Sequence, residues 1–371
     1  MIARSLQSIV KQKLNKGKAI IITGPRQVGK TTLINAVLEG KEFLFLNGDD
    51  PHTKHLLTNP NTEQLKDIIG KKKYVFIDEA QQIENIGVTL KLITDQLKEV
   101  QLLVSGSSSF ELNNKTNEPL TGRKWEYQLF PISWKEFETD RGLVKATQQL
   151  ELRLLYGMYP DVLNHPGDEV EVLKNLAGSY LYKDLLAIGG IRRPDILEKL
   201  LRALALQLGQ EVSYNELAQL LQIDKNTVSS YIDLLEKTFV VFTLQSFSRN
   251  QRNEIKNGRK IYFLDVGIRN TIIGNFQPLN LRQDKGVLWE NFLISERRKK
   301  IAYSQLLNHG YFWRTKQQQE VDYVEDADGK IAGYEIKWNS SAKVKTPTAF
   351  TAAYYQNIKT VHTENFRDFV S

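Results

Sequence analysis

The segment from Gly24 to Thr31 constrains the fold of this chain more than any other stretch of its sequence. It reads Gly-Pro-Arg-Gln-Val-Gly-Lys-Thr and matches the phosphate-binding pattern G-x-x-x-x-G-K-[ST] in full. The apolar run at 19–23 predicts a buried parallel strand before it, and residues 32–38 predict a helix after it. A glycine-rich loop between strand and helix lets backbone N–H groups and the helix N-terminus surround phosphates. The segment therefore predicts a site for a nucleoside triphosphate.

A second motif supports the first. Residues 74–77 are apolar and are followed directly by Asp78 and Glu79. A buried strand would deliver these two carboxylates to the carboxyl edge of a parallel sheet, where ligands bind in open α/β folds. We expect Asp78 to hold Mg²⁺ together with the hydroxyl of Thr31, and Glu79 to polarise the attacking water.

Two further positions are candidates for the same site. Ser107 or Ser108 follows an apolar run at 102–105 and could orient the water or sense the γ-phosphate, although a simple Gly/Ser turn explains them equally well. Arg123 could act on the γ-phosphate of a neighbouring subunit, because a planar guanidinium suits that charge, or could be an ordinary surface arginine.

The expected catalytic residues are Lys30, Glu79 and Arg123. The expected nucleotide-binding residues are Gly24, Pro25, Arg26, Gln27, Val28, Gly29, Lys30, Thr31, Thr32, Asp78 and Ser107.

Composition sets wider bounds. The 371 residues suffice for two or three domains, and a formal net charge of +7 permits a polyanionic partner without requiring one. The absence of cysteine excludes disulfides and thiolate metal sites. No apolar run approaches the roughly 20 residues of a membrane span, and the first residues lack the apolar core of a signal peptide. We therefore expect a cytoplasmic protein without a membrane partner.

The stretch 213–236 has the spacing of a helix-turn-helix, with a tight turn at 222–224. Strands are expected at 240–244 and 260–264, as in a winged helix. Such a module can grip a nucleic-acid backbone or can serve as a protein-interaction element, and both readings stay open. The basic residues of the expected wing are Arg249, Arg252, Lys256, Arg259 and Lys260.

A hairpin is expected near the C-terminus, with strands at 320–324 and 331–338. Side chains at positions i and i+2 share a face, so Glu335 and Lys337 should project together, and Asp322 could join them from the neighbouring strand. Glu290 lies on a predicted upstream helix.

These motifs resemble AAA-type P-loop ATPases, and more closely the bacterial and archaeal ATPases that add a helix-turn-helix segment and a restriction-endonuclease-like region. The resemblance is carried by residues 24–31, 78–81, 105–108, 120–123 and 129–137. It implies an α/β fold: an AAA-type ATPase domain with a parallel sheet at 1–140, a helical lid at 141–190, a winged helix at 191–270 and an α+β nuclease-like domain at 285–371.

The C-terminal hairpin in turn resembles the core of PD-(D/E)XK nucleases. That resemblance implies that Glu290, Asp322 and Glu335 hold Mg²⁺ and that Lys337 positions or activates water. Many such domains are degenerate, so cleavage itself stays open.

The sequence thus predicts ATP binding and hydrolysis with Mg²⁺, coupled to the binding or processing of nucleic acid, with double-stranded DNA as the favoured partner. The alternative is an ATP-gated protein-interaction switch whose nuclease-like domain is inert. A homo-oligomer formed through the ATPase domain is compatible with both.

Overall fold

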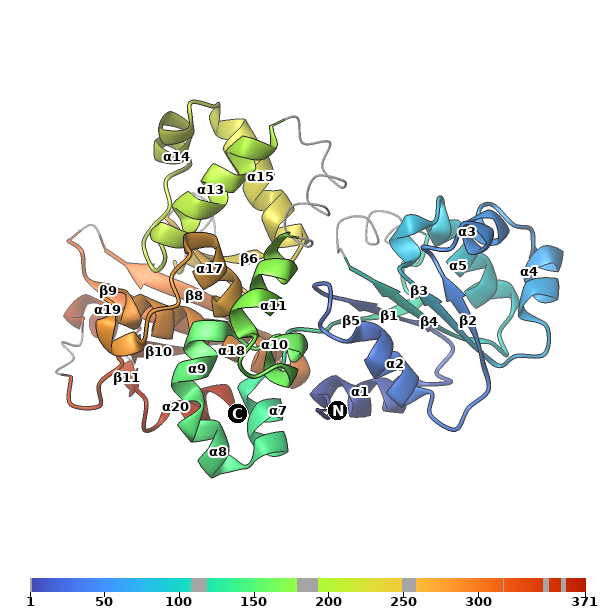
Figure 1. The fold of residues 1–371 in the computed structure, drawn as a ribbon, viewed down its shortest axis with the longest axis horizontal. Helices are drawn as coiled ribbons and strands as arrows, with labels where there is room; N and C mark the ends of the chain where they lie inside the picture. Colours follow the sequence, from blue (N-terminus) through green and yellow to red (C-terminus); the bar gives the residue numbers. More distant parts are fainter. Residues whose placement is uncertain are drawn as a thin grey trace. The chain divides into compact units, whose positions relative to one another are not determined.

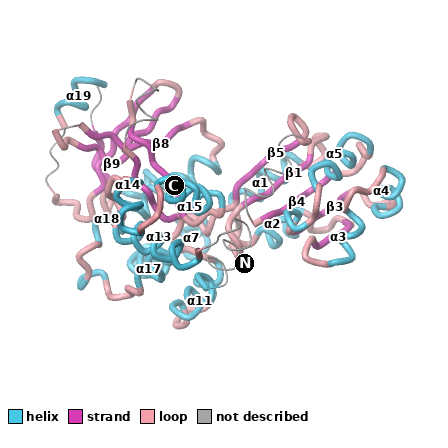
Figure 2. Tube along the Cα trace, turned by 90° about the horizontal axis from the view of Figure 1, so that it is seen from above, coloured by secondary structure: helices cyan, strands magenta, loops and turns pink. Residues whose placement is uncertain are grey.

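The computed structural model describes residues 2–107, 119–178, 193–248, 258–315, 317–342, 347–354 and 358–371. Its internal contacts divide the chain into two compact units, one of residues 1–132 with 237–239 and one of residues 133–236 with 240–371. The strands, magenta in Figure 2, form one sheet in each unit (Figures 1 and 2). No helix in the ranges described is long and apolar enough to span a membrane.

The first unit contains a five-stranded parallel sheet in the order β2-β3-β4-β1-β5. Its strands are β1 (Ala19–Thr23), β2 (Phe43–Asn47), β3 (Tyr74–Asp78), β4 (Gln101–Gly106) and β5 (Lys124–Gln128). The strands predicted at 19–23 and 74–77 are confirmed as β1 and β3, and the apolar run at 102–105 forms β4. Strand β5 was not predicted, because its sequence Lys-Trp-Glu-Tyr-Gln contains no apolar run and lies at the sheet edge.

Helices cover both faces of this sheet (Figure 1). Helices α3 (Pro51–Leu57), α4 (Thr62–Ile69) and α5 (Ile86–Gln96) bury Leu57, Leu65 and Leu90 in one core with alternate residues of the strands. Helices α1 (Ser5–Lys13) and α2 (Lys30–Val37) lie against each other on the opposite side. A short 3₁₀ turn, η1 (Ala80–Gln82), follows β3.

The second unit begins with α7 (Trp134–Arg141), which the expected boundary at residue 140 assigned to the ATPase domain. The described part of the helical lid expected at 141–190 forms four short helices, α8 (Leu143–Gln148), α9 (Leu150–Tyr156), α10 (Pro160–Asn164) and α11 (Glu169–Leu176). Gly142 and Gly157, both with positive φ, interrupt the run. Helices α9 and α11 pack against α17 (Val266–Ile273) of the same unit. Residues 179–190 of the expected lid lie outside the described residues.

Two helices joined by a tight turn form in the stretch 213–236, where the spacing predicts a helix-turn-helix. It consists of α14 (Tyr214–Leu221) and α15 (Lys225–Lys237), and α13 (Pro194–Leu206) packs against α14. Gln222 adopts the left-handed conformation that ends α14 (φ 54°). The carboxylate of Asp224 accepts hydrogen bonds from the backbone N–H groups of Asn226 and Thr227 at 2.8 and 3.0 Å and so caps α15.

A single six-stranded sheet runs through the second unit in the order β11-β10-β9-β8-β6-β7. Its strands are β6 (Val241–Ser246), β7 (Arg259–Phe263), β8 (Asn308–Arg314), β9 (Glu320–Ala327), β10 (Lys330–Ile336) and β11 (Ile358–Val361). Helix α18 (Lys285–Tyr303) packs against β7 and against α20 (Phe366–Val370), and the remaining elements are η3 (Leu279–Leu281) and α19 (Thr348–Tyr354). The expected division between 191–270 and 285–371 therefore does not separate two sheets, because β6 pairs with both β7 and β8.

Candidate functional site

The loop between β1 and α2 needs glycine at both of its pattern positions. Gly24 has a φ of +150°, and a Cβ placed there would lie 2.1 Å from the carbonyl oxygen of Leu129. Gly29 has a φ of +90°, and α2 begins at the next residue. The backbone can take this path only where no side chain intervenes.

Lys30 folds back onto this loop. Its side chain is only 5% exposed, and Nζ donates hydrogen bonds to the carbonyl oxygens of Gly24 at 3.0 Å and Pro25 at 2.8 Å. Its positive charge is therefore fixed at the loop, where the sequence places the β- and γ-phosphates.

Asp78 is held at the carboxyl end of β3 by three donors. Thr31 Oγ1 donates to Asp78 Oδ2 at 2.6 Å, the N–H of Glu79 donates to Oδ1 at 3.1 Å, and the hydroxyl of Ser105 also donates to Oδ1. The hydroxyl of Thr31 and the carboxylate of Asp78 fit Mg²⁺, which is usually held by one or two protein oxygens together with substrate phosphates and water. The sequence identified Thr31 and Asp78 but not Ser105.

Glu79 lies beside this pair in a strained conformation. Its φ and ψ of 46° and 42° are left-handed, which is unusual for a residue other than glycine. The amide of Gln81 donates to Glu79 Oε2 at 2.5 Å and to Ser107 Oγ at 3.0 Å. Gln81 therefore links Glu79 to the end of β4 and fixes the orientation of its carboxylate. Gln81 is thus a shared partner of Glu79 and Ser107, whereas Ser108 falls outside the described residues.

Arg4 contributes to this loop, and no sequence motif points to it. Its guanidinium donates to the carbonyl oxygen of Val28 at 2.6 Å and to that of Phe130 at 2.6 Å. Arg4 precedes α1, so the first residues of the chain tie the loop to the segment that follows β5.

Arg123 lies at the amino edge of the sheet, opposite the carboxyl edge that carries the phosphate loop. Strands β1 and β5 are parallel with Ala19 opposite Lys124, so Arg123 precedes β5 at the end of the sheet where β1 begins. The loop at Gly24 is one full strand away, about 16 Å for five residues. Arg123 Nε instead contacts Asp95 Oδ1 at 2.6 Å. Arg123 therefore does not reach the nucleotide site of its own chain, and only a role toward a neighbouring copy remains as a prediction.

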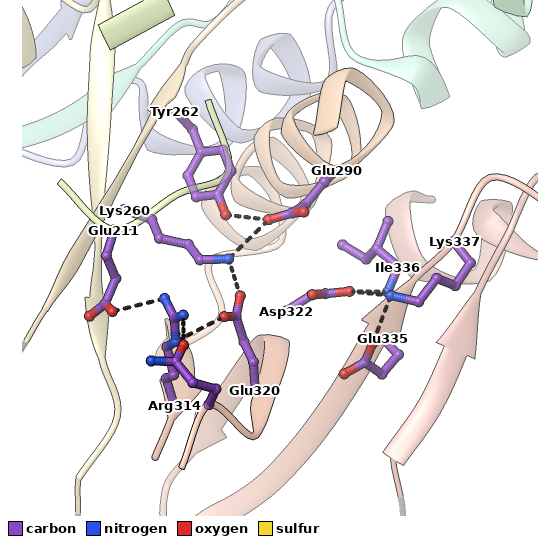
Figure 3. A network of polar contacts seen from close by, with 11 residues as sticks. Glu211, Lys260, Tyr262, Glu290, Arg314, Glu320, Asp322, Glu335, Ile336 and Lys337 are labelled. Carbon is purple, nitrogen blue, oxygen red and sulfur yellow. Dashed lines mark hydrogen bonds and ion pairs between the residues drawn. The ribbon is translucent and has the colours of Figure 1, made fainter. Parts of the chain in front are cut away.

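The C-terminal hairpin brings three of its four predicted residues together (Figure 3). Lys337 Nζ lies 2.8 Å from Glu335 Oε2 and 3.3 Å from Asp322 Oδ2, and the N–H of Ile336 donates to Asp322 Oδ2 at 2.7 Å. Burial, and next the charge of Asp322, raise the pKa of Glu335 to about 7. Burial opposes the charge of Lys337, yet Asp322 and Glu335 raise its pKa to about 12.

Glu290 has other partners. It is buried on α18, where Glu290 Oε1 accepts a hydrogen bond from the hydroxyl of Tyr262 at 2.5 Å and lies 3.4 Å from Lys260 Nζ. Lys260 Nζ also lies 2.5 Å from Glu320 Oε1 (Figure 3). Burial raises the pKa of Glu290 to about 7 against the opposing effect of Lys260. Burial disfavours the charge of Lys260, but Glu290 and Glu320 outweigh it and raise its pKa.

Glu290 does not join Asp322 and Glu335 as the third member of the expected metal set, because its carboxylate contacts Tyr262 and Lys260 instead. Within the described part of the chain, no three His, Asp or Glu side chains are grouped so that they could hold a metal ion. The ammonium groups of Lys260 and Lys337 instead neutralise these carboxylates. The sequence missed this because Lys260 lies 30 residues from Glu290, with no local signal that joins them.

Lys260 was also wrongly assigned to the basic wing. It is 1% exposed on β7 and cannot contact a nucleic acid. Arg259 lies over the ring of Tyr214, with 4.3 Å from its guanidinium carbon to the ring centroid. Arg249, Arg252 and Lys256 fall outside the described residues.

Three families match successive parts of the chain. An AAA domain family matches residues 16–138, and two domains of unknown function, DUF8612 and DUF4143, match residues 147–279 and 285–367. The α/β fold and the geometry of the loop agree with the AAA match and support a P-loop ATPase in the N-terminal part of the chain.

Relatives extend this similarity over most of the chain. An uncharacterized protein of Mycobacterium tuberculosis is 26% identical over 346 residues, which cover 92% of this chain and 75% of the relative. An uncharacterized protein of Methanocaldococcus jannaschii is 22% identical over 351 residues, which cover 88% of this chain and 76% of the relative. Among solved structures, the Walker-type ATPase PABY2304 of Pyrococcus abyssi is similar in fold, with a TM-score of 0.53 and 17% identity over 74% of this chain and 96% of that chain.

Proposed function

We propose that this chain binds ATP with Mg²⁺ and hydrolyses it at the site formed by residues 24–31 and the end of β3. The hydrogen bond of 2.6 Å between Thr31 and Asp78 carries this proposal, since it joins the phosphate loop to the carboxylate that would hold Mg²⁺. Mg²⁺, when bound, would neutralise phosphate charge. Lys30 would bind the β- and γ-phosphates, and Glu79, oriented by Gln81, would accept a proton from the attacking water.

Steady-state release of phosphate from ATP tests this proposal. The full chain should hydrolyse ATP only in the presence of Mg²⁺, and Lys30→Ala should abolish turnover. Lys41→Ala, an exposed lysine outside the loop, is the matched control and should leave turnover unchanged. Hydrolysis that persists in Lys30→Ala would contradict the assignment.

We further propose that hydrolysis is coupled to nucleic acid, with double-stranded DNA as the favoured partner. The helix-turn-helix α14–α15, with its left-handed turn at Gln222 and its cap at Asp224, supports this choice. Phosphate release measured with and without a DNA duplex tests the coupling. Stimulation that disappears in Lys30→Ala is the expected result, and hydrolysis indifferent to DNA would contradict it.

A second candidate is an ATP-gated protein-interaction switch with an inert nuclease-like domain. The contact of Lys260 with Glu290 favours it, because a buried ammonium group binds one of the carboxylates that a metal-dependent nuclease would need. Incubation of the full chain with linear and circular DNA in Mg²⁺ or Mn²⁺ tests this candidate. No cleavage is expected, and cleavage that Asp322→Ala abolishes would contradict it. A cytoplasmic location stays a prediction of the sequence.

A further inference from the structure

The amino edge of the first sheet carries a cavity of about 850 Å³, on the side of the sheet away from the phosphate loop. It lies where strands β1, β3 and β4 begin, beyond the C-terminal end of α5 and beside the turn before β5. Strand pairing places these strand starts side by side, with Ala19 opposite Lys124 and Tyr74 opposite Gln101. The cavity belongs entirely to the first unit.

Its lining is strongly basic. Five basic side chains face two carboxylates, and one of these carboxylates, Asp95, is already paired with Arg123 at 2.6 Å. Within the ranges described, Lys16, Lys73 and Lys98 are exposed and make no ion pair. The basic lining residues are Lys16, Lys18, Lys73, Lys98 and Arg123.

The positive charges form a row. In the sheet order β3-β4-β1-β5, basic side chains precede successive strands: Lys73 precedes β3, Lys98 precedes β4, Lys18 precedes β1 and Arg123 precedes β5. Neighbouring strands lie about 4.8 Å apart, so the row extends over about 15 Å. A row of this length suits a linear polyanion better than a single phosphate group.

Aromatic side chains lie among these cations. Tyr74 lines the cavity. Lys13 Nζ and Lys18 Nζ lie over the ring of Trp125 on β5, at 4.3 and 4.5 Å from the ring centroid. Basic grooves with interspersed aromatic rings are typical of surfaces that bind the backbone of single-stranded nucleic acid.

We propose that the cavity at the amino edge of the first sheet is a groove that binds the phosphodiester backbone of a nucleic acid. The proposal rests on the coupling to nucleic acid proposed above and places the contact on the ATPase domain itself. The basic residues that line the groove also contribute to the formal net charge of +7. The basic residues of the expected wing are not needed for this contribution.

Fluorescence anisotropy of the full chain, without nucleotide, tests this groove. The probes are a labelled 20-nucleotide single strand and the corresponding duplex. The variant Lys73→Glu/Lys98→Glu should bind both roughly tenfold or more weakly than wild type, and the slope of log affinity against log salt should fall by about 2. The variant Lys145→Glu/Lys174→Glu, with the same change of charge on exposed helices of the second unit, should bind as wild type.

Two outcomes would overturn the proposal. One is equal affinity of Lys73→Glu/Lys98→Glu and wild type, whether or not the melting temperature of the variant falls. The other is displacement of the probe by polyglutamate as readily as by unlabelled DNA, which would indicate an acidic protein partner.

The same variants separate this proposal from the ATPase assignment. Basal phosphate release should be unchanged in Lys73→Glu/Lys98→Glu, because neither residue contacts the phosphate loop. Absence of turnover in wild type would contradict the ATPase assignment while DNA binding still reports on the groove.

Discussion

The hydroxyl of Thr31 lies 2.6 Å from Asp78 Oδ2, so one hydrogen bond joins the first turn of α2 to the end of β3. The two residues are 47 positions apart in the chain. Their contact means that the fold of the sheet brings together the two groups that would hold Mg²⁺. Predictions about this site therefore concern residues that orient the pair as well as residues that would contact the nucleotide.

Glu79→Gln should lower kcat for ATP hydrolysis by about 100-fold or more, because the amide cannot accept a proton from water. Binding of a fluorescent ATP analogue should persist, since Glu79 does not belong to the phosphate loop. Glu84→Gln, a nearby exposed position, is the control and should turn over normally. Phosphate release and analogue binding, measured on the same preparations, distinguish a catalytic role of Glu79 from a structural one. Equal loss of both would mean that Glu79 is only structural.

Arg4→Ala should weaken ATP binding roughly tenfold, because two charge-assisted hydrogen bonds that hold the loop are lost. Arg4→Lys should recover only part of the affinity, since one ammonium cannot reproduce the forked geometry. Lys11→Ala on α1 is exposed and serves as control. Titration with the fluorescent analogue measures the effect. Wild-type affinity in Arg4→Ala would exclude this role.

Lys260→Met should reduce the free energy of unfolding by about 3–5 kcal/mol, because Glu290 and Glu320 lose their shared buried cation. The double variant Lys260→Met/Glu290→Gln should recover part of this loss, since one carboxylate no longer needs a partner. Lys330→Met, exposed on β10, should have little effect. Urea denaturation of wild type, these three variants and Glu290→Gln alone supplies the comparison, and additive losses in the double variant would show that the two side chains do not interact.

Stability should fall as pH rises from about 4.5 through about 7. The pKa of Glu290 is raised to about 7 in the folded chain, mainly by burial, from an ordinary value of 4.5. The folded state thus binds a proton that the unfolded chain releases, and that contribution is complete below the unfolded pKa and lost above the folded one.

Glu290→Gln should weaken this pH dependence without abolishing it, because the pKa of Glu335 is also raised to about 7. The fall in melting temperature between pH 5 and pH 8 should be a few degrees smaller in Glu290→Gln than in wild type. Glu171→Gln, exposed on α11, should retain the wild-type profile. Scans at intervals of one pH unit would reveal the difference. Parallel profiles of Glu290→Gln and wild type would mean that Glu290 does not titrate in this window.

Local patterns predicted the phosphate loop, the adjoining strands and the meeting of Lys30, Thr31, Asp78 and Glu79, because each depends on a short apolar run that ends at one sheet edge. Strand β5 was not predicted, because an edge strand needs no continuous apolar run. The sequence does not indicate the roles of three further residues, because these roles depend on contacts with distant segments or with a neighbouring strand. The three residues are Arg4, Ser105 and Gln81. The burial of Lys260 could not be predicted for the same reason. Its sequence neighbours suggest an exposed lysine, and only the fold shows that Glu290 and Glu320 contact it.

The pairing of β6 with both β7 and β8 has a practical consequence for dissecting this molecule. A truncation between α17 and α18 would strip β6 of its neighbour on one side and expose β8 along its length in the other fragment. Unpaired strand edges recruit other chains, so both fragments should aggregate. Expression of separate pieces should therefore be attempted at the Ile132–Ser133 junction, with the helix-turn-helix and the C-terminal hairpin kept in one polypeptide.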